Sequence, residues 1–161
     1  MIRNRVARSF AAGLECTSAL FLVLVLVVVC LQVFFRNIVN LTAPWTEEAA
    51  RYFCVWMVFL GCAAAVAYES HLRVTWLIDK LTGRMRSLAA IAICVVMLLF
   101  DMIVLIGSIR LARLNWHQEA TTFPVSISVL YAALIVFAVS SIFFLASQIV
   151  GHIARTFQGR I

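Results

Sequence analysis

Residues 45–71 read WTEEAARYFCVWMVFLGCAAAVAYESH, an apolar segment with charged and polar side chains at both ends. No side chain from Tyr52 to Tyr68 carries a charge. With the turn that starts at Glu48, the segment has roughly 20 residues, the length of helix that crosses about 30 Å of hydrocarbon. The sequence therefore predicts a membrane-spanning helix whose depth in the bilayer is fixed by its polar ends.

The polar start of this helix has a helix-capping pattern. Thr46 is expected to be the N-cap residue, because its hydroxyl can accept a free backbone N–H of the first turn. Glu47 and Glu48 then lie at the positive end of the helix dipole. Arg51 lies within helical reach of both carboxylates.

The composition places the whole chain in the membrane. Of its 161 residues, 65% are hydrophobic and only 12% are charged, whereas a soluble domain is about half apolar and a quarter charged. The net charge of +6 comes from arginines at the ends of apolar segments, which indicates membrane topology and not nucleic-acid binding. The five cysteines lie in apolar segments without a C-x-x-C pair, so we expect small buried residues, not disulfides or metal ligands.

Three further apolar segments complete an all-α integral membrane fold of four spans, at about 14–35, 47–68, 88–110 and 125–150, in a single membrane domain over residues 1–161. Between the second and third spans, about 72–82, apolar residues recur on one helix face. We expect an interfacial amphipathic helix there; the alternative is an ordinary amphipathic helix packed on protein. Its apolar side contains Val74, Trp76, Leu77, Ile78 and Leu81.

The distribution of charges predicts the orientation. Basic residues are more numerous at the N-terminus, in the segment between the second and third spans, and in the C-terminal tail than in the other two connections. By the positive-inside rule, both termini are expected in the cytoplasm.

Sequence motifs for chemistry are absent. There is no glycine-rich phosphate loop and no H-E-x-x-H, and the three histidines lie near helix ends, so we predict no enzyme activity, catalytic residue, cofactor or metal. Asp101 is an acid deep in the third span, which makes it a functional candidate by default. We expect a structural role, with Ser140 or Ser141 at similar depth as a neighbour; the alternative is ion or proton coupling.

Polar information is concentrated at the two membrane faces, which is typical of a scaffold or docking subunit. Gly61, Ala64 and Ala65 permit close packing against another helix, within the chain or in a partner. The outer patch is predicted to bind a partner and comprises Arg36, Asn37, Trp45, Glu47, Glu48 and Arg51. Two hypotheses remain for Arg36: it pairs internally with Glu47 or Glu48, or it stays free and meets an acidic partner.

Four motifs occur in order: FFRN at 34–37, WTEEAARY at 45–52, VWMVFLG at 55–61 and HLRV at 71–74. Their order and spacing resemble the small membrane subunit, of the DctQ type, of tripartite ATP-independent periplasmic (TRAP) transporters. The likeness covers nearly the whole chain in length and helix plan, although the specific motifs are confined to residues 34–74.

This resemblance implies sodium-driven import of organic acids. A soluble periplasmic protein would capture the substrate, and a large membrane subunit, here a separate chain, would carry it across. The small subunit would scaffold the large one and help to dock the binding protein. Two other functions stay open: a self-sufficient four-helix proton-coupled exporter, suggested by Glu15 in the first span, and a membrane anchor of another complex.

Overall fold

The computed structural model describes residues 5–40, 43–68, 84–122 and 125–158. Within this part of the chain the regular structure is helical. The helices are α1 (Arg5–Phe34), which continues into a π-helical turn η1 (Phe35–Val39), α2 (Pro44–Ala67), α4 (Arg84–Leu114) and α5 (Ser128–Gln158). The interfacial helix predicted at 72–82 lies outside the described residues.

The four predicted spans are confirmed. The apolar segments long enough to cross a membrane are Ala7–Val39, Pro44–Ala67, Ile91–Leu114 and Ser128–Ile149. The third helix continues four residues beyond the predicted end at 110. The fourth begins three residues later than predicted, because the backbone of residues 125–127 takes part in the connection from α4.

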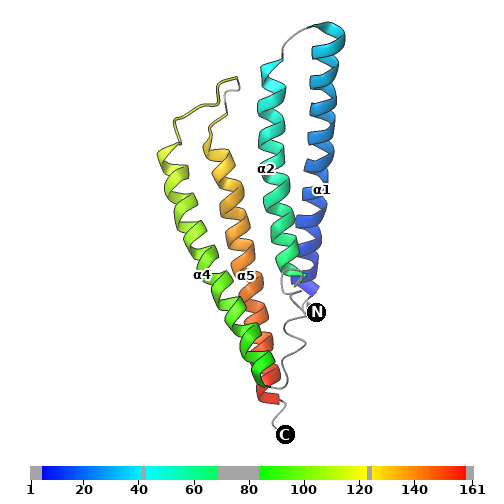
Figure 1. The fold of residues 1–161 in the computed structure, drawn as a ribbon. Coiled ribbons are helices and arrows are strands. Elements are labelled where there is room, and N and C mark those ends of the chain that lie inside the picture. The colour runs from blue at the N-terminus through cyan, green and yellow to red at the C-terminus, as the bar shows by residue number, and fades with distance from the viewer. Residues whose placement is uncertain (1–4, 41–42, 69–83, 123–124, 159–161) are drawn as a thin grey trace.

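The helices form an open row in the order α1, α2, α5, α4 (Figure 1). Neighbouring helices in this row pack against each other. Both chain termini lie at the same end of the helix axes, which we call the terminal end. At the terminal end α1 also contacts α5, because the ring of Phe10 in α1 lies 5.7 Å from the ring of Phe144 in α5. Helices α1 and α4 are therefore the edges, and α2 and α5 are the centre.

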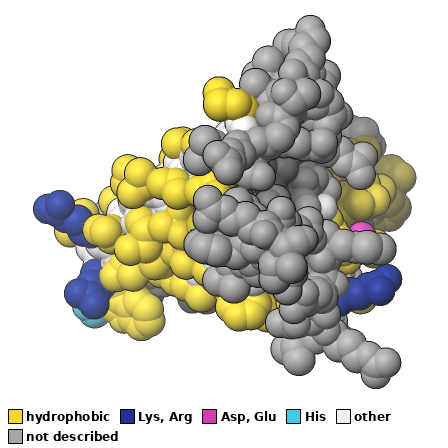
Figure 2. Space-filling model, turned by 90° about the horizontal axis from the view of Figure 1, so that it is seen from below, with side chains coloured by type: hydrophobic (Ala, Val, Ile, Leu, Met, Phe, Trp, Pro, Cys, Tyr) yellow, Lys and Arg dark blue, Asp and Glu magenta, His cyan; other side chains and the backbone are white. Residues whose placement is uncertain are grey.

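The apolar core lies in the half of the row nearest the termini. Small residues on α1 and α2 let these helices approach, and Phe144 and Leu145 of α5 fill the space beside them. The sides of α1 and α4 that face away from the row keep large exposed apolar residues such as Leu26 and Ile103. Figure 2 shows the terminal end: hydrophobic side chains cover much of the described surface in this view, and basic side chains project at its margins. The exposed apolar sides of α1 and α4 suit contact with bilayer lipid or with a partner helix.

The end of α1 differs from the expected one. The first span was predicted to end at about residue 35, but the chain stays helical as a π-turn until Val39. Asn40 then ends it in the left-handed conformation, with φ of 53°, and its N–H donates to the carbonyl of Phe35. Asparagine is among the residues that tolerate this conformation best. The π-turn places Arg36 and Asn37 within the helical rod.

The start of α2 also differs. Pro44 occupies the first turn, where its missing N–H is not needed, and Ala43 is the N-cap residue. Thr46 is therefore inside the helix, and the prediction that it caps α2 is wrong. Its hydroxyl donates to the carbonyl of Ala43 at 2.7 Å and is fully buried. Glu47 is the acidic residue of the first turn.

Candidate functional site

The connection between α4 and α5, at the end of the helices opposite the termini, is a folded hairpin. Ala120 N–H donates to the carbonyl of Val125 at 3.0 Å, and Ile127 N–H donates to that of Gln118 at the same distance. The hydroxyl of Ser126 lies 2.9 Å from the carbonyl of Trp116 and accepts from the N–H of Ser128 at 3.1 Å. The connection thus has its own hydrogen-bonded structure.

Glu48 of α2 holds this hairpin. Its carboxylate accepts from the backbone N–H groups of Thr121 and Thr122 at 3.2 and 2.9 Å, and also from the Thr122 hydroxyl. One turn further along α2, the Tyr52 hydroxyl lies 3.5 Å from the carbonyl of Ser126. A carboxylate that accepts several donors is a strong hydrogen-bonding group. These contacts fasten the start of α2 to the distant hairpin, and we call them the Glu48 clamp.

The other members of the predicted outer patch are exposed: Arg36, Asn37, Trp45, Glu47 and Arg51. Arg36 makes no ion pair with Glu47 or Glu48, although all three residues are described. Glu48 is bound to the hairpin instead, whereas Glu47 is exposed, so the role of Arg36 stays a prediction. Thr121 and Thr122, which donate to Glu48, were not singled out from the sequence, because the sequence of a polar loop does not indicate which helix the loop contacts.

Exposed side chains of the hairpin enlarge this outer surface. Trp116 is 66% exposed, more than Trp45 at 39%. His117 and Glu119 are also exposed. Among the described residues, no group of three His, Cys, Asp or Glu side chains could hold a metal ion. Exposed tryptophans and arginines are enriched at protein-binding surfaces.

The small residues of α2 pack against α1. A Cβ atom added to Gly61 would lie 3.1 Å from the hydroxyl oxygen of Ser18, and that hydroxyl donates to the carbonyl of Met57 at 2.8 Å. Ala64 is 4% exposed, and Ala65 lines the space beside it. Of the two packing roles foreseen, close contact within the chain is the one that Gly61 fulfils.

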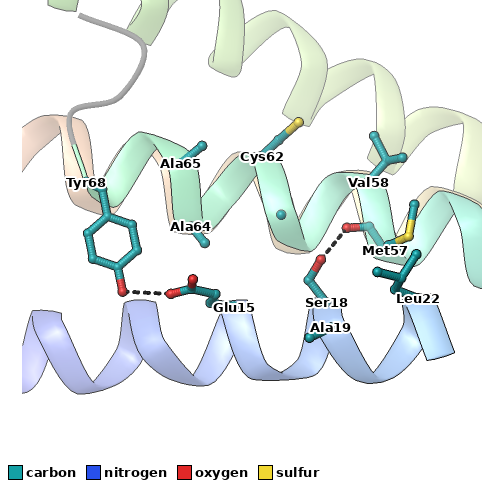
Figure 3. Close-up of a pocket in the computed structure, with 11 residues that line it drawn as sticks. Glu15, Ser18, Ala19, Leu22, Met57, Val58, Cys62, Ala64, Ala65 and Tyr68 are labelled. Carbon is teal, nitrogen blue, oxygen red and sulfur yellow. Dashed lines mark hydrogen bonds between the residues drawn. The ribbon is translucent and has the colours of Figure 1, made fainter. Parts of the chain in front are cut away.

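An open groove runs between α1 and α2 (Figure 3). At one end the Tyr68 hydroxyl donates to a carboxylate oxygen of Glu15 at 3.0 Å. This hydrogen bond to the neutral phenol raises the pKa of Tyr68 above its ordinary value. Glu15 is therefore a bound surface group, and the rest of the groove is lined mainly by apolar side chains.

Asp101 lies between α4 and α5. It is 3% exposed, and the Ser141 hydroxyl donates to its carboxyl group. The neighbour expected from depth in the membrane is confirmed for Ser141. Ser140, beside it, is 4% exposed. A second acid or a basic partner is not found beside Asp101 among the described residues.

Comparison with known proteins decides the family. Residues 25–155 match the family described as tripartite ATP-independent periplasmic transporters, DctQ component. The chain belongs to the DctQ family. Its members are components of TRAP transporters, and with four apolar spans this DctQ chain is a multi-pass protein of the inner membrane.

Individual relatives of this DctQ chain are distant. It is 26% identical over 139 residues to a Haemophilus influenzae protein whose name describes a TRAP transporter small permease, covering 86% of this chain and 84% of that one. The sialic acid TRAP transporter small permease protein SiaQ of Vibrio cholerae is 28% identical over 103 residues, 64% of this chain and 60% of its own. The isethionate TRAP transporter permease protein DctMQ of Oleidesulfovibrio alaskensis is 30% identical over 80 residues, half of this chain and 13% of its own.

Proposed function

We propose that this DctQ chain is the small permease subunit of a sodium-driven importer of organic acids. It scaffolds a separate large permease, which carries the substrate, and helps to dock a soluble periplasmic binding protein. Two relatives are named for organic anions, sialic acid and isethionate, which supports this substrate class. Both termini lie in the cytoplasm, and the Glu48 clamp lies at the periplasmic face.

The open row of helices is the observation that carries the scaffold role. Buried polar groups are few within the described row: Thr46, Asp101, Ser108, Ser128, Ser140 and Ser141. Several of them bond to other groups of the same chain, as Ser128 of α5 does to the carbonyl of Ala112 in α4 at 2.7 Å. Transport proteins place broken helices and convergent polar groups near the midplane. The apolar sides of the row instead suit lipid and a neighbouring subunit.

The exposed outer surface supports the docking role. Arg36, Arg51 and Trp116 are free to meet a soluble partner, and the Glu48 clamp keeps the hairpin that carries Trp116 in a fixed place. Basic side chains on such a surface increase the rate of association with an acidic partner. We infer that the partner's contacting patch is acidic.

The experiment is reconstitution. The large permease and this chain are purified together by a tag on the former, placed in proteoliposomes, and supplied with the binding protein and radiolabelled sialic acid or isethionate. Uptake requires an inward sodium gradient, is lost when this chain is omitted, and is not restored by potassium. Failure of the two membrane chains to copurify, or equal uptake without this chain, rejects the proposal.

The exporter alternative has its own test. Glu15, the acid that suggested it, is hydrogen-bonded by Tyr68 at the end of a helix pair and does not face a second acid in the described part of the row. We expect no increase in drug resistance when this chain is expressed alone in a sensitive strain. Resistance that disappears in Glu15→Gln would favour export.

A further inference from the structure

The groove between α1 and α2 has a shape and a location that suit one lipid chain. Its volume is about 690 Å³. Along α2 it extends from Tyr68 to Met57, which is about 16 Å at 1.5 Å per residue. Half of the hydrocarbon thickness of a bilayer is about 15 Å. The groove therefore matches a single leaflet and ends near the middle of the membrane.

Side chains from both helices form the walls of this groove. Ala19 and Leu22 of α1 line the groove together with Val58, Gly61 and Cys62 of α2. In Figure 3 the side chains of Val58 and Cys62 project from the side of α2 that faces away from α1. The hydroxyl of Ser18 already donates to the carbonyl of Met57, so its proton is used within the protein. A ligand in this part of the groove is therefore held mainly by apolar contact and not by hydrogen bonds.

The terminal end of the groove is charged. Glu15 and Tyr68 meet there, and Arg8 lies close enough to Tyr68 to act on it electrostatically. Arg8 and Glu15 are both exposed, so they can contact a ligand in the interfacial layer. Tyr68 engages one carboxylate oxygen of Glu15, and a carboxylate has acceptor capacity for further donors. An anionic and a cationic group therefore lie within two turns of each other beside an apolar groove.

We propose that this groove binds one phospholipid with a zwitterionic headgroup, phosphatidylethanolamine. Its ammonium group donates to Glu15, its phosphate faces Arg8, and one acyl chain lies along Ala19, Gly61 and Val58. An anionic lipid such as phosphatidylglycerol leaves Glu15 without a cation. A partner helix that crosses the whole bilayer would cover α1 and α2 beyond Met57, whereas the groove stops there.

The first test measures which lipid stays bound. The full chain is purified in mild detergent from membranes containing both phosphatidylethanolamine and phosphatidylglycerol, and retained lipid is counted by native mass spectrometry. We expect one phosphatidylethanolamine per chain. Glu15→Gln lowers the ratio of phosphatidylethanolamine to phosphatidylglycerol by about fivefold, the upper value for one exposed ion pair. Glu119→Gln, in the exposed hairpin, leaves the ratio unchanged. No retained lipid, or equal loss in both variants, overturns the proposal.

The second test fills the groove. Ala19→Phe places a ring where the acyl chain lies and is expected to abolish retention, whereas Ala92→Phe, at an exposed position of α4 outside the groove, retains the lipid. Circular dichroism of both variants confirms that they are folded. Equal retention in the two variants contradicts the site.

The third test separates a lipid from a helix. In the complex with the large permease, a photoreactive maleimide is placed on Cys62 in a variant that lacks the other cysteines. Its cross-linked product contains phospholipid if the proposal is right. A product with the large permease shows that a partner helix fills the groove and overturns it.

Discussion

The carboxylate of Glu48 accepts a hydrogen bond from the backbone N–H of Thr122 at 2.9 Å, across 74 positions of the chain. This contact joins the start of α2 to the hairpin between α4 and α5. It links the two helix pairs at their outer ends, far from the apolar core near the termini. The position of the hairpin relative to α2 therefore depends on Glu48, together with the contact of Tyr52 with Ser126.

Replacing Glu48 should release the hairpin without unfolding the helices. In Glu48→Ala the amides of Thr121 and Thr122 lose their acceptor, so we expect their hydrogen exchange to become faster, measured by mass spectrometry. Glu47→Ala is the matched control, because Glu47 is exposed and has no hydrogen bond to the described hairpin. Unchanged exchange in Glu48→Ala would contradict the clamp.

Gly61 should tolerate a methyl group less well than other glycines. In Gly61→Ala the new Cβ meets the Ser18 oxygen at 3.1 Å, which disturbs its bond to Met57 and offsets the gain of up to about 1 kcal/mol in helix propensity. Gly107→Ala, with nothing within 4 Å of its Cβ, should keep that gain. Thermal melting in detergent compares them.

The larger Gly61→Leu should separate α1 from α2 and cost about 1–3 kcal/mol, as overpacking does. Removing the obstructing oxygen gives an independent check on the cause. In a double-mutant cycle, Gly61→Ala should lower the melting temperature less in a Ser18→Ala background than in the wild-type chain. If Gly61 and Gly107 respond alike to alanine, the close contact does not limit stability.

Asp101 should be structural. We expect Asp101→Asn to keep sodium-driven uptake within a few-fold, because the amide retains an acceptor for the Ser141 hydroxyl. A double-mutant cycle of Asp101→Ala and Ser141→Ala should give a coupling of about 0.6–1.7 kcal/mol, the range of interhelical hydrogen bonds in membranes. An assembled Asp101→Asn complex that has lost its sodium or proton dependence would assign Asp101 to coupling.

Arg36 should act on the soluble partner. Because Glu48 is bound to the hairpin, Arg36→Glu is expected to leave the membrane complex assembled and to weaken binding of the periplasmic protein, measured by surface plasmon resonance. The loss should shrink at high salt, since exposed charges are screened. Recovery of complex stability by adding Glu48→Arg would instead indicate an internal pair. Wild-type uptake in Arg36→Glu would remove Arg36 from both roles.

Orientation can be tested with reporter fusions. The excess of arginine and lysine at the terminal end predicts cytoplasmic signals for fusions at Gly83 and Gly159 and periplasmic signals at Asn40 and Gln118. Alkaline phosphatase and green fluorescent protein report opposite sides of the membrane. A cytoplasmic signal at Asn40 would reverse the assignment of the Glu48 clamp to the periplasmic face.

The helices could be predicted because apolar length alone defines a membrane span. Their ends were less accurate, since local backbone bonding decides them: Pro44 and not Thr46 starts α2, and pairing of Val125 and Ile127 in the hairpin delays α5. Asp101 and Ser141 could be matched by depth, because both lie in continuous spans. The partner of Glu48 could not, because it depends on how a polar hairpin folds over a helix distant in sequence.

A row one helix thick responds to tilting differently in its two directions. At 8–10 Å between neighbouring axes, a straight row of four helices separates its edge helices by about 25–30 Å. The contact of Phe10 with Phe144 makes this separation of α1 and α4 smaller at the terminal end. Rocking in the plane of the row moves these edge helices vertically in opposite directions and exposes their apolar bands to water, at a cost that increases with this lever arm. Rocking across the row has almost no lever arm. A row of this shape therefore resists tilting in its own plane more strongly than tilting across that plane.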